Sequence, residues 1–464
     1  MRSPCMRELL AIWMGRVAGS LSRRLGRGGG TTVPGRIARR IAPQILTQLT
    51  NRLPHGVIVV AGTNGKTTTT RMIASLLQAS GWRLLHNRSG ANLVTGVTTT
   101  VIDGVRWSGA LPYDAALFEC DEAALPQIIR EAQPRVVVLH NLFRDQLDRY
   151  GEVDTIAANW KTALSALPAH TIVLINGDDP SLARLGAALH CTVIPYGNDD
   201  VASARGSVEH LADAGFCHCG AAFVYTVRFF GHIGHYRCTV CGFARPQPVY
   251  ALKSVVPDAL RGNALTLQMS TRVVDLQLPM PGLYNAMNAL AAVATTDALG
   301  RTSDYVPVFA QFQAAFGRYE VIQTPAHTLV LALIKNPIGA SETLRMLVEA
   351  WHTQVRMLII INDRDADGTD VSWLWDADFE LLPDHLSHVT VSGTRAADMH
   401  VRLKYAGVPV ERIDTNDDIA TALDAALASQ PAGSTVYVLP TYTAMLELRA
   451  VLVARGWAQP FWND

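Results

Sequence analysis

The strongest structural signal in this chain is the stretch VIVVAGTNGKTTTTRMI, Val57 to Ile73. It opens with an apolar β-branched run, turns at a polar segment with two glycines, and continues in a pattern typical of a helix. The turn, Gly62 to Thr67, therefore lies between a buried strand and the start of a helix. Glycines there let backbone N–H groups approach phosphate oxygens, and the helix N-terminus adds the positive end of its dipole. The stretch predicts a phosphate-binding loop in an α/β fold.

The side chains of this loop suit a nucleoside triphosphate. Lys66 can reach the β- and γ-phosphates, and the Thr67 hydroxyl can bind Mg²⁺. The general pattern has a glycine five positions before Gly65, where this chain has Val60. A tight βα turn with a solvated lysine is the alternative. The candidate nucleotide ligands are Gly62, Thr63, Asn64, Gly65, Lys66, Thr67 and Thr68.

The composition is that of a folded enzyme. Of 464 residues, 49% are hydrophobic and 17% are charged, which favours two or three domains with cores of their own. The formal net charge is zero, so no overall field favours nucleic acid as a partner. Residues 1–55 differ, because they carry ten arginines and one acid, Glu8. Such a segment can be a solvated helix face, a patch for anionic lipid or a transit peptide.

Apolar runs alternate with helical patterns along most of the chain, and continuous hydrophobicity indicates strands buried on both faces of a mostly parallel sheet. We expect an N-terminal helical segment at 1–50, a central domain at 51–315 and a Rossmann-like α/β domain at 316–464. A small insertion is expected at 205–250. No secretory signal and no bilayer-spanning apolar run is visible, which predicts a cytoplasmic protein. The expected strands are 57–61, 115–120, 136–140, 171–175, 328–334, 355–361, 388–392 and 434–439.

Four of the seven cysteines cluster in the insertion. Cys217 and Cys219 form one knuckle, and Cys238 and Cys241 form a second, C-x-x-C-G. Four thiolates from two knuckles predict a closed, structural zinc site of the ribbon type. The first knuckle has C-x-C spacing, so His218, His232 or His235 remain alternative ligands, although surface positions are expected for His232 and His235. A hairpin packed on aromatic side chains without metal is the other alternative.

Several further segments resemble Mur ligases and folylpolyglutamate synthases. FECDEA (118–123) resembles the segment that places a magnesium-binding carboxylate, here Glu119, opposite the loop. GLYNAMNALAA (282–292) resembles the segment whose first asparagine, here Asn285, contacts adenine. FGRYE (316–320) resembles the junction that supplies a phosphate-binding arginine, here Arg318. The resemblance implies a Mur ligase-like central domain that binds ATP and Mg²⁺.

Departures from the Mur ligase pattern indicate which family within this superfamily the chain resembles. Amino-acid-adding Mur ligases carry D-x-x-H-N-P, whereas this chain has Ala332 and Lys335 at the acid and histidine positions. Gln146 replaces another family histidine. These features, the cysteine insertion and NDRDADGTDVSWLWDADFE (362–380) resemble the MurT family, the synthetase subunits of lipid II isoglutaminyl synthases.

The MurT resemblance implies a function. The α-carboxyl of D-glutamate in the peptidoglycan stem peptide of lipid II would be amidated to D-isoglutamine through an acyl phosphate. Lys66 and Glu119 would be catalytic, and ammonia would come from a GatD-like glutaminase partner. An acid of this chain, Asp370 or Asp367, would complete the partner's active site; the alternative is that these aspartates cap a helix or solvate the loop.

The alternative functions are an amino-acid-adding ligase of the same superfamily, such as a folylpolyglutamate synthase, and a zinc-ribbon ATPase acting on nucleic acid. Because the implied substrate is lipid-anchored, a position at the inner face of the membrane is also expected.

Overall fold

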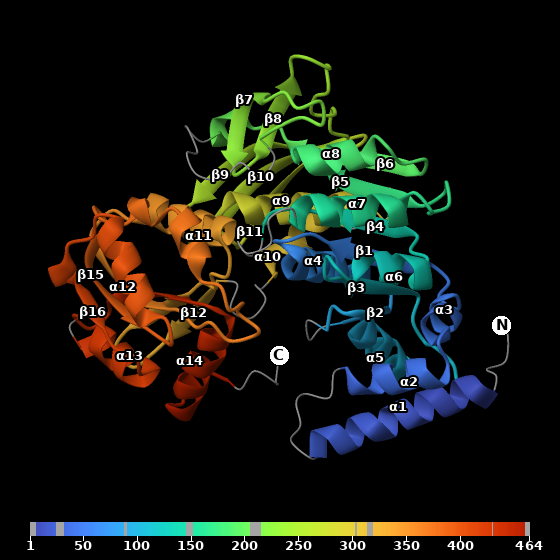
Figure 1. The fold of residues 1–464 in the computed structure, drawn as a ribbon, viewed down its shortest axis with the longest axis horizontal. Coiled ribbons are helices and arrows are strands. Elements are labelled where there is room, and N and C mark those ends of the chain that lie inside the picture. The colour runs from blue at the N-terminus through green and yellow to red at the C-terminus, as the bar shows by residue number, and fades with distance from the viewer. Residues whose placement is uncertain are drawn as a thin grey trace.

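The computed structural model describes residues 6–24, 32–87, 91–144, 152–204, 215–301, 304–312, 319–428 and 430–459. Two large sheets dominate the described chain, one of nine strands and one of six. Figure 1 shows them side by side, with the N-terminal helices at the lower right and the C-terminal sheet at the left. No helix in these ranges is both long and apolar enough to cross a bilayer.

The nine-stranded sheet has the order β11-β10-β9-β6-β5-β4-β1-β3-β2. Its strands run parallel from β2 to β9, and β10 and β11 extend one edge in antiparallel pairing. The strands are β1 (Val57–Ala61), β2 (Leu84–His86), β3 (Ala115–Glu119), β4 (Val136–Leu139), β5 (Ile172–Asn176), β6 (Thr192–Asn198), β9 (Tyr250–Asp258), β10 (Gly262–Gln268) and β11 (Val273–Leu278).

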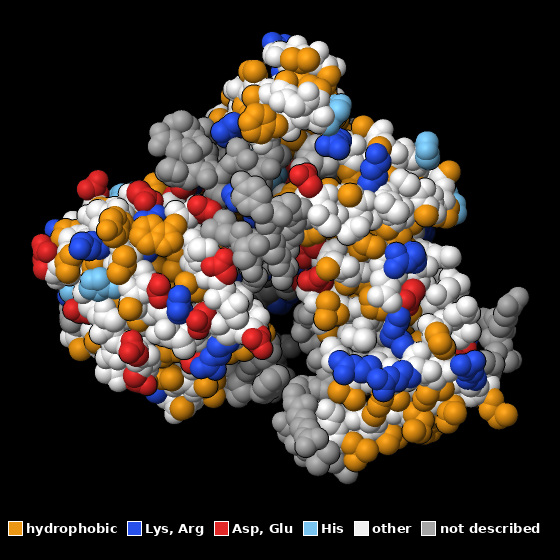
Figure 2. All heavy atoms as spheres, viewed as in Figure 1, with side chains coloured by type: hydrophobic (Ala, Val, Ile, Leu, Met, Phe, Trp, Pro, Cys, Tyr) orange, Lys and Arg blue, Asp and Glu red, His pale blue; other side chains and the backbone are white. Residues whose placement is uncertain are grey.

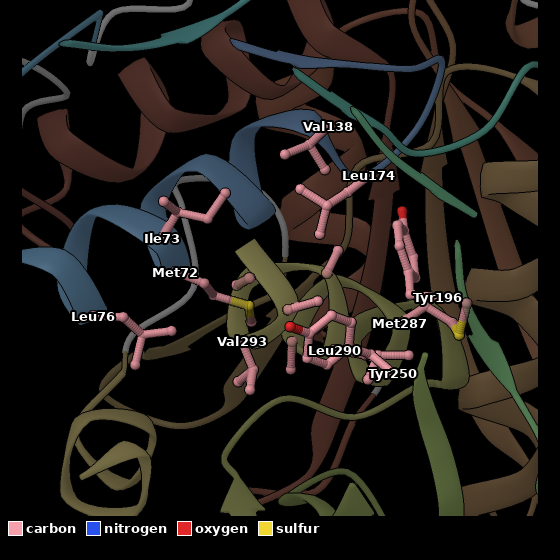
Figure 3. Packing of buried hydrophobic residues seen from close by; sticks show 14 of the residues in the cluster. Met72, Ile73, Leu76, Val138, Leu174, Tyr196, Tyr250, Met287, Leu290 and Val293 are labelled. Atoms are coloured by element: carbon pink, nitrogen blue, oxygen red, sulfur yellow. The ribbon is translucent and has the colours of Figure 1, made fainter. Parts of the chain in front are cut away.

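Helices cover both faces of this sheet, so the central strands β1 and β4 are apolar at every position. Along β1, Ile58 and Val60 join one core, while Val57, Val59 and Ala61 join the other. The first core lies under α4 (Lys66–Ala79) and α9 (Leu283–Ala298), whose side chains meet those of β4 and β5 in Figure 3. The second lies under α5 (Val94–Gly104), α6 (Leu125–Ala132), α7 (Glu152–Leu164) and α8 (Pro180–Gly186).

Three N-terminal helices pack outside α5 and α6: α1 (Met6–Arg24), α2 (Val33–Ile41) and α3 (Ile45–Thr50). Glycine permits the close contact between α2 and α5. A Cβ on Gly35 would lie 2.0 Å from the carbonyl oxygen of Thr95.

The insertion forms a separate hairpin of β7 (Phe223–Phe230) and β8 (Ile233–Cys238), at the top of Figure 1. A 3₁₀ turn, η1 (Val201–Ser203), precedes it, and α10 (Tyr305–Ala310) follows α9.

The C-terminal sheet has the order β12-β13-β17-β14-β15-β16, parallel except at β12. Its strands are β12 (Glu320–Gln323), β13 (Thr328–Leu331), β14 (Val355–Ile360), β15 (Leu386–Ser392), β16 (Ile413–Thr415) and β17 (Thr435–Pro440). Its helices are α11 (Pro337–Ala350), α12 (Ala396–Tyr405), α13 (Ile419–Ala428) and α14 (Tyr442–Ala454), with 3₁₀ turns η2 (Ser372–Asp376), η3 (Phe379–Leu381) and η4 (Val410–Arg412). The eight expected strands are all present, and the α/β class is confirmed.

Candidate active site

The loop between β1 and α4 has the geometry of a phosphate cradle. Gly62 and Gly65 have φ values of +145° and +86°, in the region that favours glycine. A Cβ on Gly65 would lie 2.3 Å from Oδ1 of Asn288, so no larger residue fits. Helix α4 begins at Lys66, so the positive end of its dipole lies at the loop, where it favours a bound anion.

Two pairs of hydrogen bonds hold the loop in place. The backbone N–H of Asn64 donates to Oδ1 of Asn141 (2.8 Å), and Nδ2 of Asn141 returns a bond to the Asn64 carbonyl (3.0 Å). The Thr63 hydroxyl donates to the Phe143 carbonyl (3.1 Å) and accepts from its N–H (3.0 Å). These bonds fix the loop before any nucleotide arrives.

The Lys66 ammonium is buried over the loop. It donates to the carbonyls of Gly62 (2.5 Å) and Thr63 (3.1 Å) and pairs with Glu122 (2.8 Å). Glu122 is a residue that the sequence analysis missed, although it lies in the same FECDEA segment as Glu119. It holds the lysine beside the loop, where the lysine can exchange a carboxylate partner for a phosphate.

Glu119 ends β3, directly beside Val60 of β1, and is 6% exposed. Thr67 lies in the first turn of α4 and is half-buried. Hydroxyl and carboxylate oxygens are the ligands that Mg²⁺ prefers. The two residues thus come from neighbouring elements at the carboxyl end of the sheet, and their chemistry suits the ion.

A relay of buried hydrogen bonds forms the floor of the site. Asn285 donates to the Pro281 carbonyl (2.7 Å) and accepts from Nδ2 of Asn288 (3.2 Å), which leaves Oδ1 of Asn288 as an acceptor. His140 Nε2 lies 2.6 Å from that oxygen, so Nε2 carries the proton. Nδ1 then accepts from the Tyr196 hydroxyl (2.8 Å).

Burial lowers the pKa of His140 to about 4, so its imidazole is neutral at physiological pH. His140 was not among the predicted site residues, although it closes an expected strand, where functional side chains gather in parallel sheets.

An open cleft lies over this floor and encloses about 790 Å³ of space, open solvent included. Asn64, Gly65 and Thr68 line one side, and Asn285 lines the floor. Its other wall comes from the C-terminal part of the chain and consists of Ala332, Leu333, Ile338, Gly339, Glu342 and Thr343.

Asn336 joins that wall to the phosphate loop. Its Nδ2 donates to Oδ1 of Asn64 (3.0 Å), and its Oδ1 accepts from the Gly339 N–H (2.8 Å) as the N-cap of α11. An asparagine before a proline at the first helical position is a recognisable cap. Asn336 was not among the predicted site residues, although the dipeptide Asn336-Pro337 carries this cap signal.

Arg318 and Gln146 lie outside the described residues. The acidic loop after β14 is described. Asp370 accepts from the Ser372 N–H (2.8 Å) at the start of η2, and Asp367 accepts from the N–H of Thr443 (2.7 Å) at the start of α14. Both aspartates thus order neighbouring elements, while both remain partly exposed.

The four clustered cysteines converge. Their Sγ atoms all lie within 4.8 Å of one another, with Cys217 3.4 Å from Cys241 and Cys219 3.4 Å from Cys238. Tetrahedral zinc with Zn–S bonds of about 2.3 Å needs sulfurs about 3.8 Å apart. The cluster therefore fits zinc, and the C-x-C knuckle contributes both of its thiols.

Backbone geometry and hydrogen bonding support that assignment. Gly220 and Gly242, one after each knuckle, have positive φ. The backbone N–H of Cys241 lowers the pKa of Cys238 to about 6, whereas burial raises the pKa of Cys217 to about 12, so of these two thiols only Cys238 is shifted towards the thiolate that metals bind.

The expected surface position of His232 is wrong. Its ring is fully buried, 4.7 Å from that of Phe143 between centroids and 3.3 Å from an oxygen of Asp179, because the hairpin base packs against the main sheet. His235 is half-buried and bonds the Asn198 carbonyl (2.7 Å). Neither belongs to the cysteine cluster.

Comparison with known proteins decides the family. Residues 60–233 match the Mur ligase middle domain, and residues 333–445 match the MurT ligase C-terminal family. The subunit MurT of lipid II isoglutaminyl synthase (glutamine-hydrolyzing) from Streptococcus pneumoniae is 34% identical, over 97% of this chain and 98% of that protein. The chain belongs to the MurT family.

A MurT subunit from Staphylococcus aureus is 33% identical, over 89% of this chain and 91% of its own length. Among solved structures, a pseudomurein peptide ligase type C from Methanothermus fervidus shares the fold, with a TM-score of 0.67 and 18% identity. That match covers 89% of this chain and 81% of the archaeal chain. MurT family membership makes this chain a Mur ligase-type, ATP-dependent ligase, and it confirms the family and fold expected from the motifs.

Proposed function

We propose that this chain amidates the α-carboxyl of D-glutamate in the stem peptide of lipid II. The observation that carries the proposal is the match along nearly the whole chain to subunits named lipid II isoglutaminyl synthase. The phosphate loop and the cavity beside it supply a site where ATP and a carboxylate can meet.

The reaction requires activation, because a carboxylate has no leaving group that ammonia can displace. In the first step, a carboxylate oxygen attacks the γ-phosphorus of ATP and ADP leaves, which gives an acyl phosphate. In the second step, ammonia attacks the acyl carbon, inorganic phosphate leaves, and the nitrogen loses a proton. Catalysis then consists of alignment and charge neutralisation.

Each residue has a proposed role. Lys66 leaves Glu122 and neutralises the transferring phosphoryl group, and Arg318 adds a second positive charge. Thr67 and Glu119 hold Mg²⁺, which neutralises phosphate charge when bound. Asn285 contacts the adenine from the cavity floor.

The wall of the cavity favours ammonia over an amino acid as the nucleophile. Ala332 is buried in that wall, and Lys335 replaces the histidine of the ligase motif. No acid–histidine pair is therefore present at these two positions to orient an incoming amino acid. Restoring both, as Ala332→Asp with Lys335→His, should not increase amidation, and a faster variant would contradict this reading.

Ammonia would be supplied by a GatD-like glutaminase subunit, in keeping with the glutamine-hydrolysing relatives. Asp370 or Asp367 would complete the partner's active site, and the partner would dock near the loop that carries them. We place the complex in the cytoplasm, at the inner face of the membrane that holds lipid II. We also propose that the four-cysteine cluster binds zinc and fixes the β7–β8 hairpin.

The test is co-expression with a candidate glutaminase, followed by an assay of glutamine- and ATP-dependent amidation by mass spectrometry. The expected result is amide formation that Lys66→Ala reduces by about 10²-fold or more. Lys161→Ala, at an exposed lysine on α7, is the matched control and should retain full activity. Amidation that persists without ATP would overturn the proposal.

A further inference from the structure

The N-terminal helix α1 has its large apolar side chains on the outside. Its buried face consists mainly of small residues, Ala11, Gly15 and Gly19, together with Ile12. A Cβ on Gly15 would lie 2.9 Å from the Pro34 carbonyl, so α1 packs closely on α2. The opposite face presents Met6, Leu10, Trp13, Met14, Val17 and Leu21, between 42 and 87% exposed.

These six residues, here called the α1 stripe, recur at helical spacing over most of a 19-residue helix. Trp107, from the turn after α5, extends the stripe, because its ring centroid lies 3.9 Å from that of Trp13. Figure 2 shows orange side chains along the outer edge of α1. No part of the described chain covers them, and contiguous apolar surface of this kind marks a contact with a membrane or a protein.

Arginines outnumber acids around the stripe, where Asp103, at the end of α5 beside Arg16, is an exposed acid. Arg7, Arg36, Arg40 and Arg106 are exposed on α1, α2 and the Trp107 turn. Blue side chains border the orange edge in Figure 2. The single acid of α1, Glu8, is buried and paired with Arg52 at 2.6 Å. After Glu8, the next acid in the sequence is Asp103.

We infer that the α1 stripe and its arginines bind the surface of an anionic lipid bilayer, with α1 lying in the plane of the interface. An apolar stripe bordered by arginine suits acyl chains below and anionic headgroups beside it. Tryptophan, here Trp13 and Trp107, is enriched at the membrane–water interface. The charge complementarity favours lipid over a protein partner. One further argument rests on the proposed function: a lipid-linked substrate lies at the bilayer, so the enzyme has to bind it there.

Vesicle co-sedimentation of the full-length chain tests this inference and needs no catalysis. Phosphatidylcholine vesicles with and without phosphatidylglycerol are compared at low and high salt. Binding is expected on the anionic vesicles and should weaken with salt, because surface charges are screened. Leu10→Gln/Met14→Gln and Arg36→Glu/Arg40→Glu should each reduce binding by about 10-fold or more.

Val401→Gln/Tyr405→Gln is the matched control, since it removes an exposed apolar pair at the same spacing on α12. It should bind vesicles like the parent chain. Circular dichroism and thermal melting verify that each variant folds.

Two results would overturn the inference. The first is equal vesicle binding by the parent and both α1–α2 variants. The second is a parent chain that does not bind anionic vesicles but forms a dimer in sedimentation velocity, while Leu10→Gln/Met14→Gln is a monomer. Vesicle binding without amidation would count against the proposed function alone.

Discussion

Asn336 and Asn64 are hydrogen-bonded across 272 positions of the chain, with Nδ2 of Asn336 3.0 Å from Oδ1 of Asn64. The bond joins the cap of α11 to the middle of the phosphate loop. The C-terminal part of the chain therefore contacts the candidate nucleotide site directly and contributes to its wall. This contact couples the position of α11 to the loop that would hold the phosphates.

Replacing Asn336 tests that coupling. Asn336→Ser keeps an oxygen that can cap α11 but cannot reach Asn64. One lost hydrogen bond corresponds to about 1 kcal/mol, so kcat/KM for ATP should fall roughly 5-fold while Tm changes little. Steady-state kinetics and differential scanning calorimetry measure both. Asn416→Ser, at an asparagine distant from the loop, is the control, and an unchanged kcat/KM in Asn336→Ser would refute the coupling.

His140 should make folding stability depend on pH. Burial holds its pKa near 4, below the value of about 6.5 in an unfolded chain, so the unfolded state binds the proton more readily. Stability contributed by His140 is present above about pH 6.5 and is lost as the pH falls towards 4. The loss should be about 2 kcal/mol between pH 7 and pH 5.

Urea unfolding at both pH values measures this effect. His140→Gln keeps a donor for Asn288 but does not titrate, so its pH dependence should be smaller by that amount. Parallel curves for the two proteins would show that His140 is not the titrating group.

The cysteine cluster should hold about one zinc ion per chain. Metal analysis of protein grown with zinc is expected to show it, and chelation should lower Tm by about 5 °C or more. Cys238→Ser and Cys217→Ser should both lose the metal, because both thiols converge. Cys191→Ser, outside the cluster, should retain it. Full zinc content in Cys217→Ser would remove that residue from the ligand set.

The acidic loop should serve the partner's chemistry. With glutamine as the nitrogen source, Asp370→Asn or Asp367→Asn should reduce amidation by at least about 10²-fold, because asparagine preserves the local bonds but not the charge. With ammonium chloride, the same variant should amidate at nearly the parent rate. Asp365→Asn, at an exposed aspartate in the same loop, is the control. Equal loss with both nitrogen sources would point to a folding defect.

Eight of the parallel strands could be predicted from continuous apolar runs, whereas the parallel strands β2, β6, β9 and β16 were not predicted. The antiparallel extension, β10 and β11, was not predicted. Its strands alternate exposed and buried residues, for example Val273 and Leu276, and lack the continuous apolar signal. Edge strands of this kind depend on pairing that local sequence does not reveal.

The phosphate loop could be predicted because a short segment carries its glycines, lysine and threonine together. The relay from Asn285 through Asn288 to His140 could not, since its members lie on α9 and after β4 and meet only in the folded chain. His232 was misplaced for a similar reason. Its neighbours Phe143 and Asp179 are far away in sequence, so burial came from tertiary packing.

Phosphoryl transfer to the substrate carboxylate is tested most directly by an isotope. The substrate is labelled with ¹⁸O in the D-glutamate α-carboxyl, and the phosphate released during amidation is analysed by mass spectrometry. Passage through an acyl phosphate predicts that each phosphate released carries one oxygen from that carboxyl. Unlabelled phosphate accompanying full amide formation would contradict the account.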